Sequence, residues 1–115
     1  MKTSKTIGRL TLVLEGQDVG NDLLVTLTGG KAHIGAAALA YPDKETGRIT
    51  ASVMSAPGHK EEEIALYGAK TISKETNKTV LFAAGIHLDD ISAEEIEEIE
   101  KACMEMIQSC LKNLD

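Results

Sequence analysis

The segment TGGKAHIG at residues 28–35 combines residue types that could hold an anion or move a proton. Free backbone N–H groups at Gly29 and Gly30, next to the cation of Lys31, would suit one anionic group. On an extended chain Lys31 and His33 project from the same face, which places an imidazole beside that cation. The segment therefore predicts a small anion site, and a plain turn is the alternative.

This segment is not a phosphate loop of the kind found in nucleotide triphosphatases. Such a loop needs a glycine, four further residues, and then Gly-Lys followed by Ser or Thr. Here Val25 stands where the first glycine is needed, and Ala32 follows Lys31. We therefore exclude a P-loop enzyme.

A second candidate is GHKEEE, where Gly58, His59 and Lys60 precede a predicted helix. Unpaired N–H groups at a helix N-terminus attract anions, but the following glutamates, which begin at Glu61, compete for the same positive end. A solvated first turn is the alternative. If this segment lies beside Gly29 to Lys31, the two would form one rim carrying Lys31, His33, His59 and Lys60, an adjacency that the sequence does not reveal.

The three histidines, His33, His59 and His87, do not have the short spacings of zinc sites, and no cysteine lies near them. We therefore expect no metal. No nucleophile elbow, no cysteine with a partner base and no paired carboxylates in an apolar setting are present. Asp89 and Asp90 are assigned to the turn before the last helix. The residues thus give no positive indication of catalysis.

Four strands are predicted before the first helix. Residues 7–15 alternate apolar and polar side chains, and residues 23–28 follow after a short link with Gly20 and Asn21, which favours a hairpin. Residues 32–41 form a strand of small side chains, and PDKETG leads to a β-branched strand at 48–55. The short connections predict an antiparallel meander.

The small side chains of the third strand allow something to approach closely. Glycine in a strand often marks such an approach, and Gly35 is followed by four alanines within five residues. The simplest interpretation is a closely packed helix, and a ligand or a partner is the other. Gly68, inside the predicted first helix, likewise indicates a close approach to the sheet.

The remaining elements are helix, strand and helix. Residues 61–72 carry three glutamates at the start and apolar residues along one face. Residues 79–86 predict a strand buried on both faces. Ser92 and Glu95 form a capping box, which opens a helix with an apolar stripe through Cys110. We expect a single α+β domain over residues 1–115, with order ββββαβα and helices packed on the sheet.

Bulk composition narrows the function. The net charge of −6 and an aromatic content of 3% disfavour nucleic acid as a partner. The acidity is concentrated in residues 89–115, which hold nine acidic and two basic residues. Cys103 and Cys110 are expected to be buried thiols in a reducing compartment. No export signal and no membrane span are evident, so we expect a cytoplasmic protein.

The element order together with TGGKAHIGAAALA, PGHKEEEIA and GIHLDDISAEEIEEI resembles the LpdD-like family of prenylated-flavin-associated accessory proteins. The resemblance runs from about Leu10 to Met106. It implies a fold like that of proteasome assembly chaperones and a link to UbiD-type decarboxylases. It also implies that prenylated FMN or FMN is handled transiently, by a segment that meets cofactor or client. That segment comprises Gly29, Gly30, Lys31, His33, Gly35, Gly58, His59, Lys60 and Glu61.

The leading hypothesis is a non-catalytic accessory protein that assists maturation, assembly or prenylated-FMN loading of a UbiD-type decarboxylase. Its expected partners are that decarboxylase or a flavin prenyltransferase, and a second copy of itself in a homodimer. One alternative is a small enzyme that uses His33 or His59 as acid or base, with Lys31 holding an anionic substrate. A homodimeric scaffold module is the third hypothesis.

Overall fold

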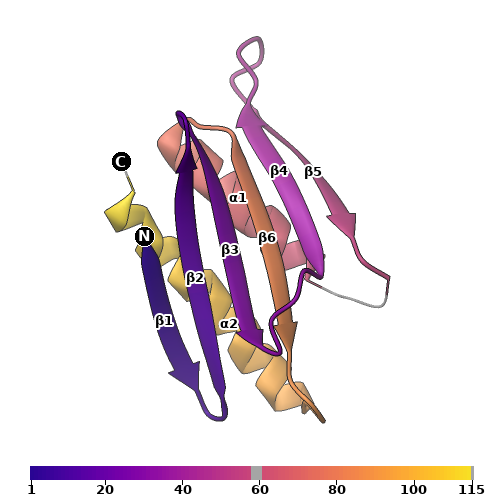
Figure 1. The fold of residues 1–115 in the computed structure, drawn as a ribbon. Helices are drawn as coiled ribbons and strands as arrows, with labels where there is room; N and C mark the ends of the chain where they lie inside the picture. Colours follow the sequence, from indigo (N-terminus) through magenta and orange to yellow (C-terminus); the bar gives the residue numbers. More distant parts are fainter. Residues whose placement is uncertain (58–60, 115) are drawn as a thin grey trace.

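The protein forms an α+β fold in which two helices cover one face of a six-stranded sheet (Figure 1). A computed structural model describes residues 1–57 and 61–114. The strands are β1 (Lys2–Ile7), β2 (Leu10–Val19), β3 (Asp22–Gly30), β4 (Ala36–Pro42), β5 (Ile49–Ser55) and β6 (Val80–His87). The helices are α1 (Glu62–Thr76) and α2 (Ala93–Cys110), followed by a short 3₁₀ turn, η1 (Leu111–Asn113). No helix in the described ranges is long and apolar enough to span a membrane.

The sheet is mixed, with strand order β1-β2-β3-β6-β4-β5. The predicted hairpins are confirmed, because β2 pairs with β3 and β4 pairs with β5, both antiparallel. The predicted four-stranded meander is wrong, because β6 lies between β3 and β4 and runs parallel to β3. The apolar run of β6 gains both a parallel and an antiparallel neighbour at this central position.

Two strand boundaries also differ from the prediction. The first predicted strand began at Ile7, but Gly8 has a positive φ and forms a turn between the additional strand β1 and β2. β1, with sequence KTSKTI, lies at the sheet edge, and five of its six residues are exposed, so no buried periodicity marks it. β4 begins at Ala36 rather than at Ala32, and residues 31–35 instead connect β3 to β4 across the end of β6.

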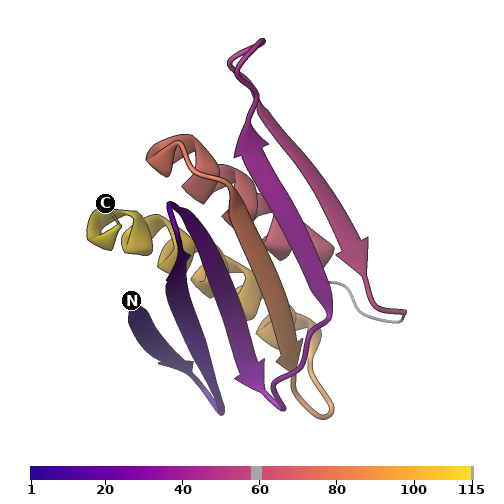
Figure 2. The same ribbon diagram turned by 45° about the horizontal axis from the view of Figure 1, so that its top comes forward.

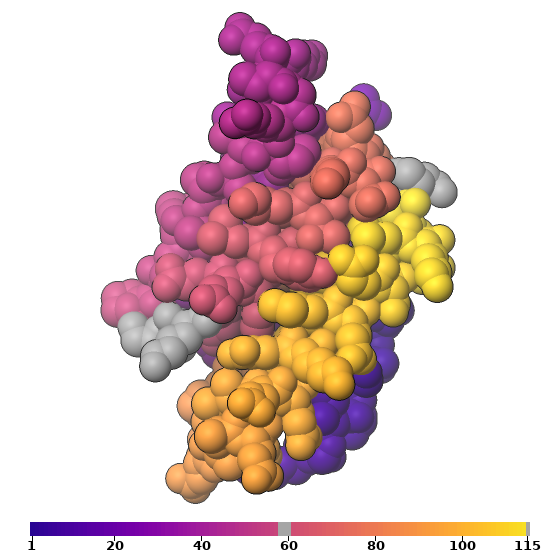
Figure 3. Space-filling model, turned by 180° about the vertical axis from the view of Figure 1, so that it is seen from behind, coloured from indigo at the N-terminus to yellow at the C-terminus, as the bar shows by residue number. Residues whose placement is uncertain are grey.

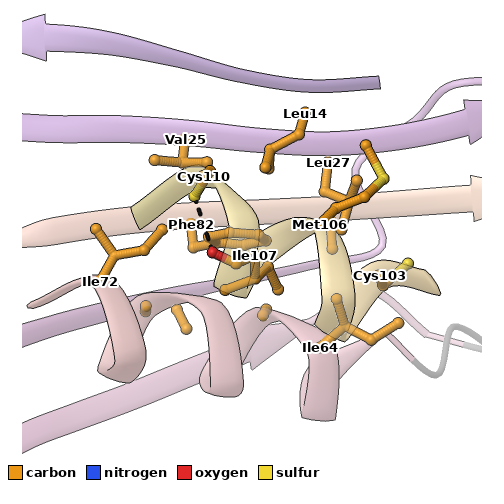
Figure 4. Close-up of a cluster of buried hydrophobic side chains, with 14 of the residues drawn as sticks. Leu14, Val25, Leu27, Ile64, Ile72, Phe82, Cys103, Met106, Ile107 and Cys110 are labelled. Carbon is orange, nitrogen blue, oxygen red and sulfur yellow. Dashed lines mark hydrogen bonds between the residues drawn. The ribbon is translucent and has the colours of Figure 1, made fainter. Parts of the chain in front are cut away.

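The alanines of β4 serve the close packing of α1. Ala36, Ala38 and Ala40 are fully buried on the face that the helices cover, and their partners on α1 are small or branched: Ile64, Ala65, Gly68, Ala69 and Ile72. A Cβ on Gly68 would collide with the ring of Phe82, which confirms the close approach predicted for this glycine. Figure 4 shows Phe82, Ile72 and Ile107 within this core.

The opposite face of the sheet has no helix or strand over it in the part of the chain that the structure describes (Figure 2). β6 is therefore buried on one face only, which corrects the prediction of two buried faces; Leu81 is 39% exposed. We call the outward-pointing residues in the middle of β3, β6, β4 and β5 the bare face, which leaves out Asp22 at the start of β3 and Gly85 and His87 at the end of β6. The residues of the bare face are Leu24, Thr26, Thr28, Leu81, Ala83, Ala37, Leu39, Tyr41, Thr50, Ser52 and Met54.

The capping box of α2 is confirmed. The Ser92 hydroxyl accepts from the N–H of Glu95, and the Glu95 carboxylate accepts from the N–H of Ser92. Arg9, in the turn before β2, adds a two-pronged contact to Glu95 at 3.0 and 3.1 Å. Its hydrogen bonds lower the pKa of Glu95 to about 2, with a further contribution from Ser92. Cys103 and Cys110 are buried free thiols, as predicted, and burial raises the pKa of Cys103 to about 12.

We predict that Gly68→Ala destabilises the protein by about 1–2 kcal/mol. Overpacking against Phe82 costs about 1–3 kcal/mol, and the higher helix propensity of alanine returns about 1 kcal/mol. Denaturant unfolding followed by circular dichroism measures the difference. Glu75→Ala, at an exposed position of the same helix, is the control and should change stability by less than about 0.5 kcal/mol. An unchanged or higher unfolding midpoint for Gly68→Ala would contradict the predicted contact.

Candidate functional site

The connection from β3 to β4, residues 31–35, lies directly against the end of β6. A Cβ on Gly30 would collide with the carbonyl of His87, and one on Gly85 would collide with the carbonyl of His33. Gly30 also has a φ of 66°, a conformation that glycine adopts without strain. The amide of Gly35 donates to the carbonyl of Ala84 (2.8 Å), and the carbonyl of Gly35 accepts from Ala56 (2.7 Å). Three glycines thus allow two backbone segments to touch, and we call residues 31–35 the crossover.

The crossover places His33 next to Glu61, the residue before α1. His33 Nε2 is 3.4 Å from Glu61 Oε1. The same oxygen accepts from the backbone N–H of Ile86 at 3.4 Å. The two loop segments therefore meet at His33 and Glu61. Glu61 is only 8% exposed, whereas Glu62 and Glu63 are exposed and form the solvated first turn that was considered from the sequence.

Glu61 lies close to the crossover because residue 35 has no side chain. A Cβ on Gly35 would occupy the position of the Glu61 carboxylate. The next glutamate, Glu62, turns instead to the Ser55 hydroxyl, which donates to it at 2.8 Å. Gly35 is thus a positioning residue for the His33–Glu61 pair.

A second histidine–carboxylate pair lies beside the first. His87 Nε2 is 2.9 Å from Asp89 Oδ1, and Lys31 Nζ is 3.5 Å from Asp89 Oδ2. The His87 hydrogen bond, followed by the Lys31 charge, lowers the pKa of Asp89. The rings of His33 and His87 meet edge to face with centroids 6.4 Å apart. We call Lys31, His33, Glu61, His87 and Asp89 the histidine–carboxylate cluster.

Sequence reasoning identified part of this cluster. Lys31, His33, Gly35 and Glu61 were predicted site residues and lie together at the crossover. From the sequence, His87 was considered only as a possible metal ligand, and Asp89 only as a residue of the turn before the last helix. Their HLD spacing after a buried strand was the available signal, but only the central place of β6 brings them to His33. Gly58, His59 and Lys60 lie outside the described residues.

The glycine pair does not form the open loop of free amides on which the predicted anion site depends. Gly29 and Gly30 end β3; Gly29 pairs with Leu12 and Ile86, and Gly30 pairs with His87. The next amide, that of Lys31, donates to the His87 carbonyl at 3.2 Å. Among the described residues, no group of three or more His, Cys, Asp or Glu side chains is arranged to hold a metal ion.

Carboxylates flank both histidines of the cluster. Each of the two rings has a carboxylate oxygen within 3.4 Å. Lys31 and Asp89 are largely exposed, whereas Glu61 and much of His33 are covered. The cluster is therefore accessible through its Lys31 and Asp89 side and is fixed from within by Glu61.

We predict that Gly35→Ala displaces the Glu61 carboxylate and costs about 1–3 kcal/mol of stability, the usual range for overpacking. The His33 ring and the Ile86 amide should both shift in NMR spectra, because each contacts that carboxylate. Gly16→Ala is the matched control, since its added methyl would come closest to the flexible end of Met1, at 3.0 Å, and would otherwise make ordinary contacts with Leu23 and Met1 at 3.9–4.0 Å. Gly35→Ala spectra in which neither resonance moves would refute the positioning role of Gly35.

Comparison with solved structures shows the same fold in a chain of a chaperone complex. The chain is similar to one in a structure described as the crystal structure of a novel chaperone complex for yeast 20S proteasome assembly. The TM-score is 0.60 at 12% sequence identity, covering 98% of this chain and 95% of that chain. At this identity the similarity establishes the fold alone. A comparison with curated proteins finds no match.

Comparison with protein-family models identifies the family. Residues 6–115 match the model described as the prenylated flavin chaperone LpdD-like domain, which confirms the resemblance inferred from the sequence. The match covers nearly the whole chain, including both helices and the complete histidine–carboxylate cluster. The chain therefore belongs to the LpdD-like prenylated flavin chaperone family.

Proposed function

We propose that the protein is a cytoplasmic, non-catalytic accessory protein that assists maturation, assembly or prenylated-FMN loading of a UbiD-type decarboxylase. The observation that carries the proposal is the family match over residues 6–115. A chaperone family implies a client protein. The decarboxylase, or the flavin prenyltransferase that supplies its cofactor, is the client that we propose.

The crossover is the part of the molecule that we assign to the client. Lys31 and Asp89 are exposed there with side-chain accessibilities of 76% and 65%, and Ile34 is 70% exposed beside them. A cation, a carboxylate and an apolar side chain together offer the mixed contacts of a protein interface. This surface is held in place by Gly29, Gly30, His33, Gly35 and Glu61. Residues 58–60 directly precede Glu61 in the sequence.

The flavin phosphate fits this end of the molecule poorly. In the histidine–carboxylate cluster Lys31 is paired with Asp89, and Glu61 adds a second carboxylate. A phosphate dianion would meet two negative groups and one cation that is already engaged. This charge pattern supports a role in client contact for the crossover, and the prenylated FMN that the family description implies requires a separate place for its phosphate.

A small enzyme is the second candidate, and the His33–Glu61 pair is the observation that favours it. A histidine 3.4 Å from a largely covered carboxylate resembles the pairing of an acid–base residue with the group that orients it. The accessory role is better supported, because the family match concerns the whole chain and the pair concerns two side chains.

We further propose a homodimer formed through the bare face. Its eleven residues carry no formal charge, although 26% of the chain is charged. Leu24, Leu81 and Leu39 lie side by side across three strands, and Met54 on β5 is 76% exposed. Two such faces meet without repulsion in a two-fold arrangement, whereas the acidic helix face would repel its copy.

The area of the bare face limits such a dimer to a weak one. Four strands spaced about 4.8 Å apart and roughly 20 Å long present about 400 Å² per copy. This corresponds to about 800 Å² in total, which is below the roughly 1,200 Å² of stable specific interfaces. The bare face therefore supports a weak, reversible dimer.

We predict that affinity capture from the native host with the tagged protein enriches a UbiD-type decarboxylase or a flavin prenyltransferase. Lys31→Glu should reduce the recovered client several-fold, because it reverses the exposed charge at the crossover. Lys101→Glu, which makes the same charge change at an exposed position of α2, should leave recovery unchanged. Enrichment of neither enzyme, as quantified by mass spectrometry, would count against the accessory role.

We predict that light scattering at tens of micromolar gives the mass of a dimer. Leu81→Glu should convert the protein to a monomer, because it buries an unpaired carboxylate at the centre of the bare face. Met104→Glu replaces a similarly exposed methionine on α2, 38% exposed, and should remain dimeric. Circular dichroism melting confirms that both variants fold. A monomeric parent protein, or equal dissociation of both variants, would rule out this interface.

A further inference from the structure

A groove lies at the end of the molecule opposite the crossover. It is bounded by the β4–β5 hairpin and the C-terminal half of α1, with a volume of 510 Å³. Its lining residues are Pro42, Gly47, Arg48, Ile49, Lys70, Thr71, Lys74 and Asn77. Figure 3 shows the hairpin projecting past the end of α1, with a notch between the two. The size lies in the range of about 300–1,000 Å³ that is typical of small-molecule sites.

The groove is positively charged in a protein of net charge −6. Arg48, Lys70 and Lys74 line it, and none of the lining residues is acidic. Within residues 1–57 and 61–114, no carboxylate forms an ion pair with any of these three cations. Asp43 lies across the hairpin from Arg48, whose carbonyl accepts from the Asp43 amide at 2.8 Å, but the Asp43 carboxylate accepts from the amide of Glu45 at 2.9 Å. The three positive charges are therefore available to a ligand.

The other lining groups suit a phosphate ester. The Thr71 hydroxyl and the Asn77 amide add neutral hydrogen-bond donors, while Pro42 and Ile49 provide an apolar wall. The negative end of α1 is partly neutralised, because Asn77 N–H and the Thr76 hydroxyl satisfy the carbonyls of Ser73 and Ile72. A guanidinium and two ammonium groups match the charge and the acceptor oxygens of a phosphate dianion.

We propose that this groove binds the phosphate monoester of a small ligand, and that in this family the ligand is FMN or its prenylated form. The ligand's identity rests on the proposed function, whereas phosphate binding rests on the charges of the groove. Arg48, Lys70 and Lys74 hold the phosphate, and the apolar wall contacts the part of the ligand next to it. Cofactor and client thereby occupy opposite ends of the sheet (Figure 1).

The test compares FMN with riboflavin, which lacks the phosphate, by flavin fluorescence and by NMR of the amides at residues 70–77. FMN should bind at least about 10-fold more tightly at low salt, since charge-assisted hydrogen bonds carry the difference, and millimolar inorganic phosphate should displace it. Lys70→Gln combined with Lys74→Gln should abolish the preference for FMN. Lys31→Gln and Lys101→Gln, which remove one charge each elsewhere, should retain it.

Three results would overturn the proposal. They are equal affinities for FMN and riboflavin, loss of the preference in Lys31→Gln, and amides at 70–77 that do not respond to FMN or phosphate. Thermal melting of the double variant checks its fold, and Arg48→Gln provides an independent second test. Failure of client capture with intact FMN preference would refute the accessory role alone. Client capture without FMN preference would refute the groove alone.

Discussion

The contact between the crossover and the end of β6 is the constraint on which the rest of the structure depends. β6 occupies the centre of the sheet, so the chain leaving β3 must pass over it to reach β4. Side chains at residues 30, 35 or 85 would collide with the carbonyls of His87 and His33 or with the Glu61 carboxylate. Glycine at these positions allows the passage. The same passage brings His33, Glu61, His87 and Asp89 to one end of the sheet.

The one-sided arrangement of the helices divides the molecule into surfaces of different chemistry. The helix-covered face holds the core, and its alanines and Gly68 let α1 approach the sheet closely. The bare face is uncharged and partly apolar, the crossover end carries paired charges, and the hairpin end carries cations with which no carboxylate of the described residues forms an ion pair. The contacts that we propose with a client, a cofactor and a second copy of the chain would each need a separate surface, and this topology offers three.

Predictions that rest on signals between residues close together in the sequence are the ones that the structure confirms. The capping box of Ser92 and Glu95 spans three residues and is found as predicted, as are the hairpins with short turns. β1 escaped prediction because an exposed edge strand has no buried periodicity. Three of the five cluster residues, Lys31, His33 and Glu61, were identified from residue types. His87 and Asp89 were not grouped with them, because they are more than fifty residues from Lys31 and His33 in the chain.

By itself the sequence determined the α+β class, the secondary-structure order from β2 onward, the buried thiols and the close approach that small residues permit, because these depend on local periodicity, capping and side-chain size. Only the tertiary structure decided which segments of the chain come close to these small residues. At the glycines it is the chain's own crossover, and at the alanines it is α1. Strand order depends on pairing between distant segments, so β6 could take its central place, and the two histidine–carboxylate pairs could meet, only when the whole sheet was formed.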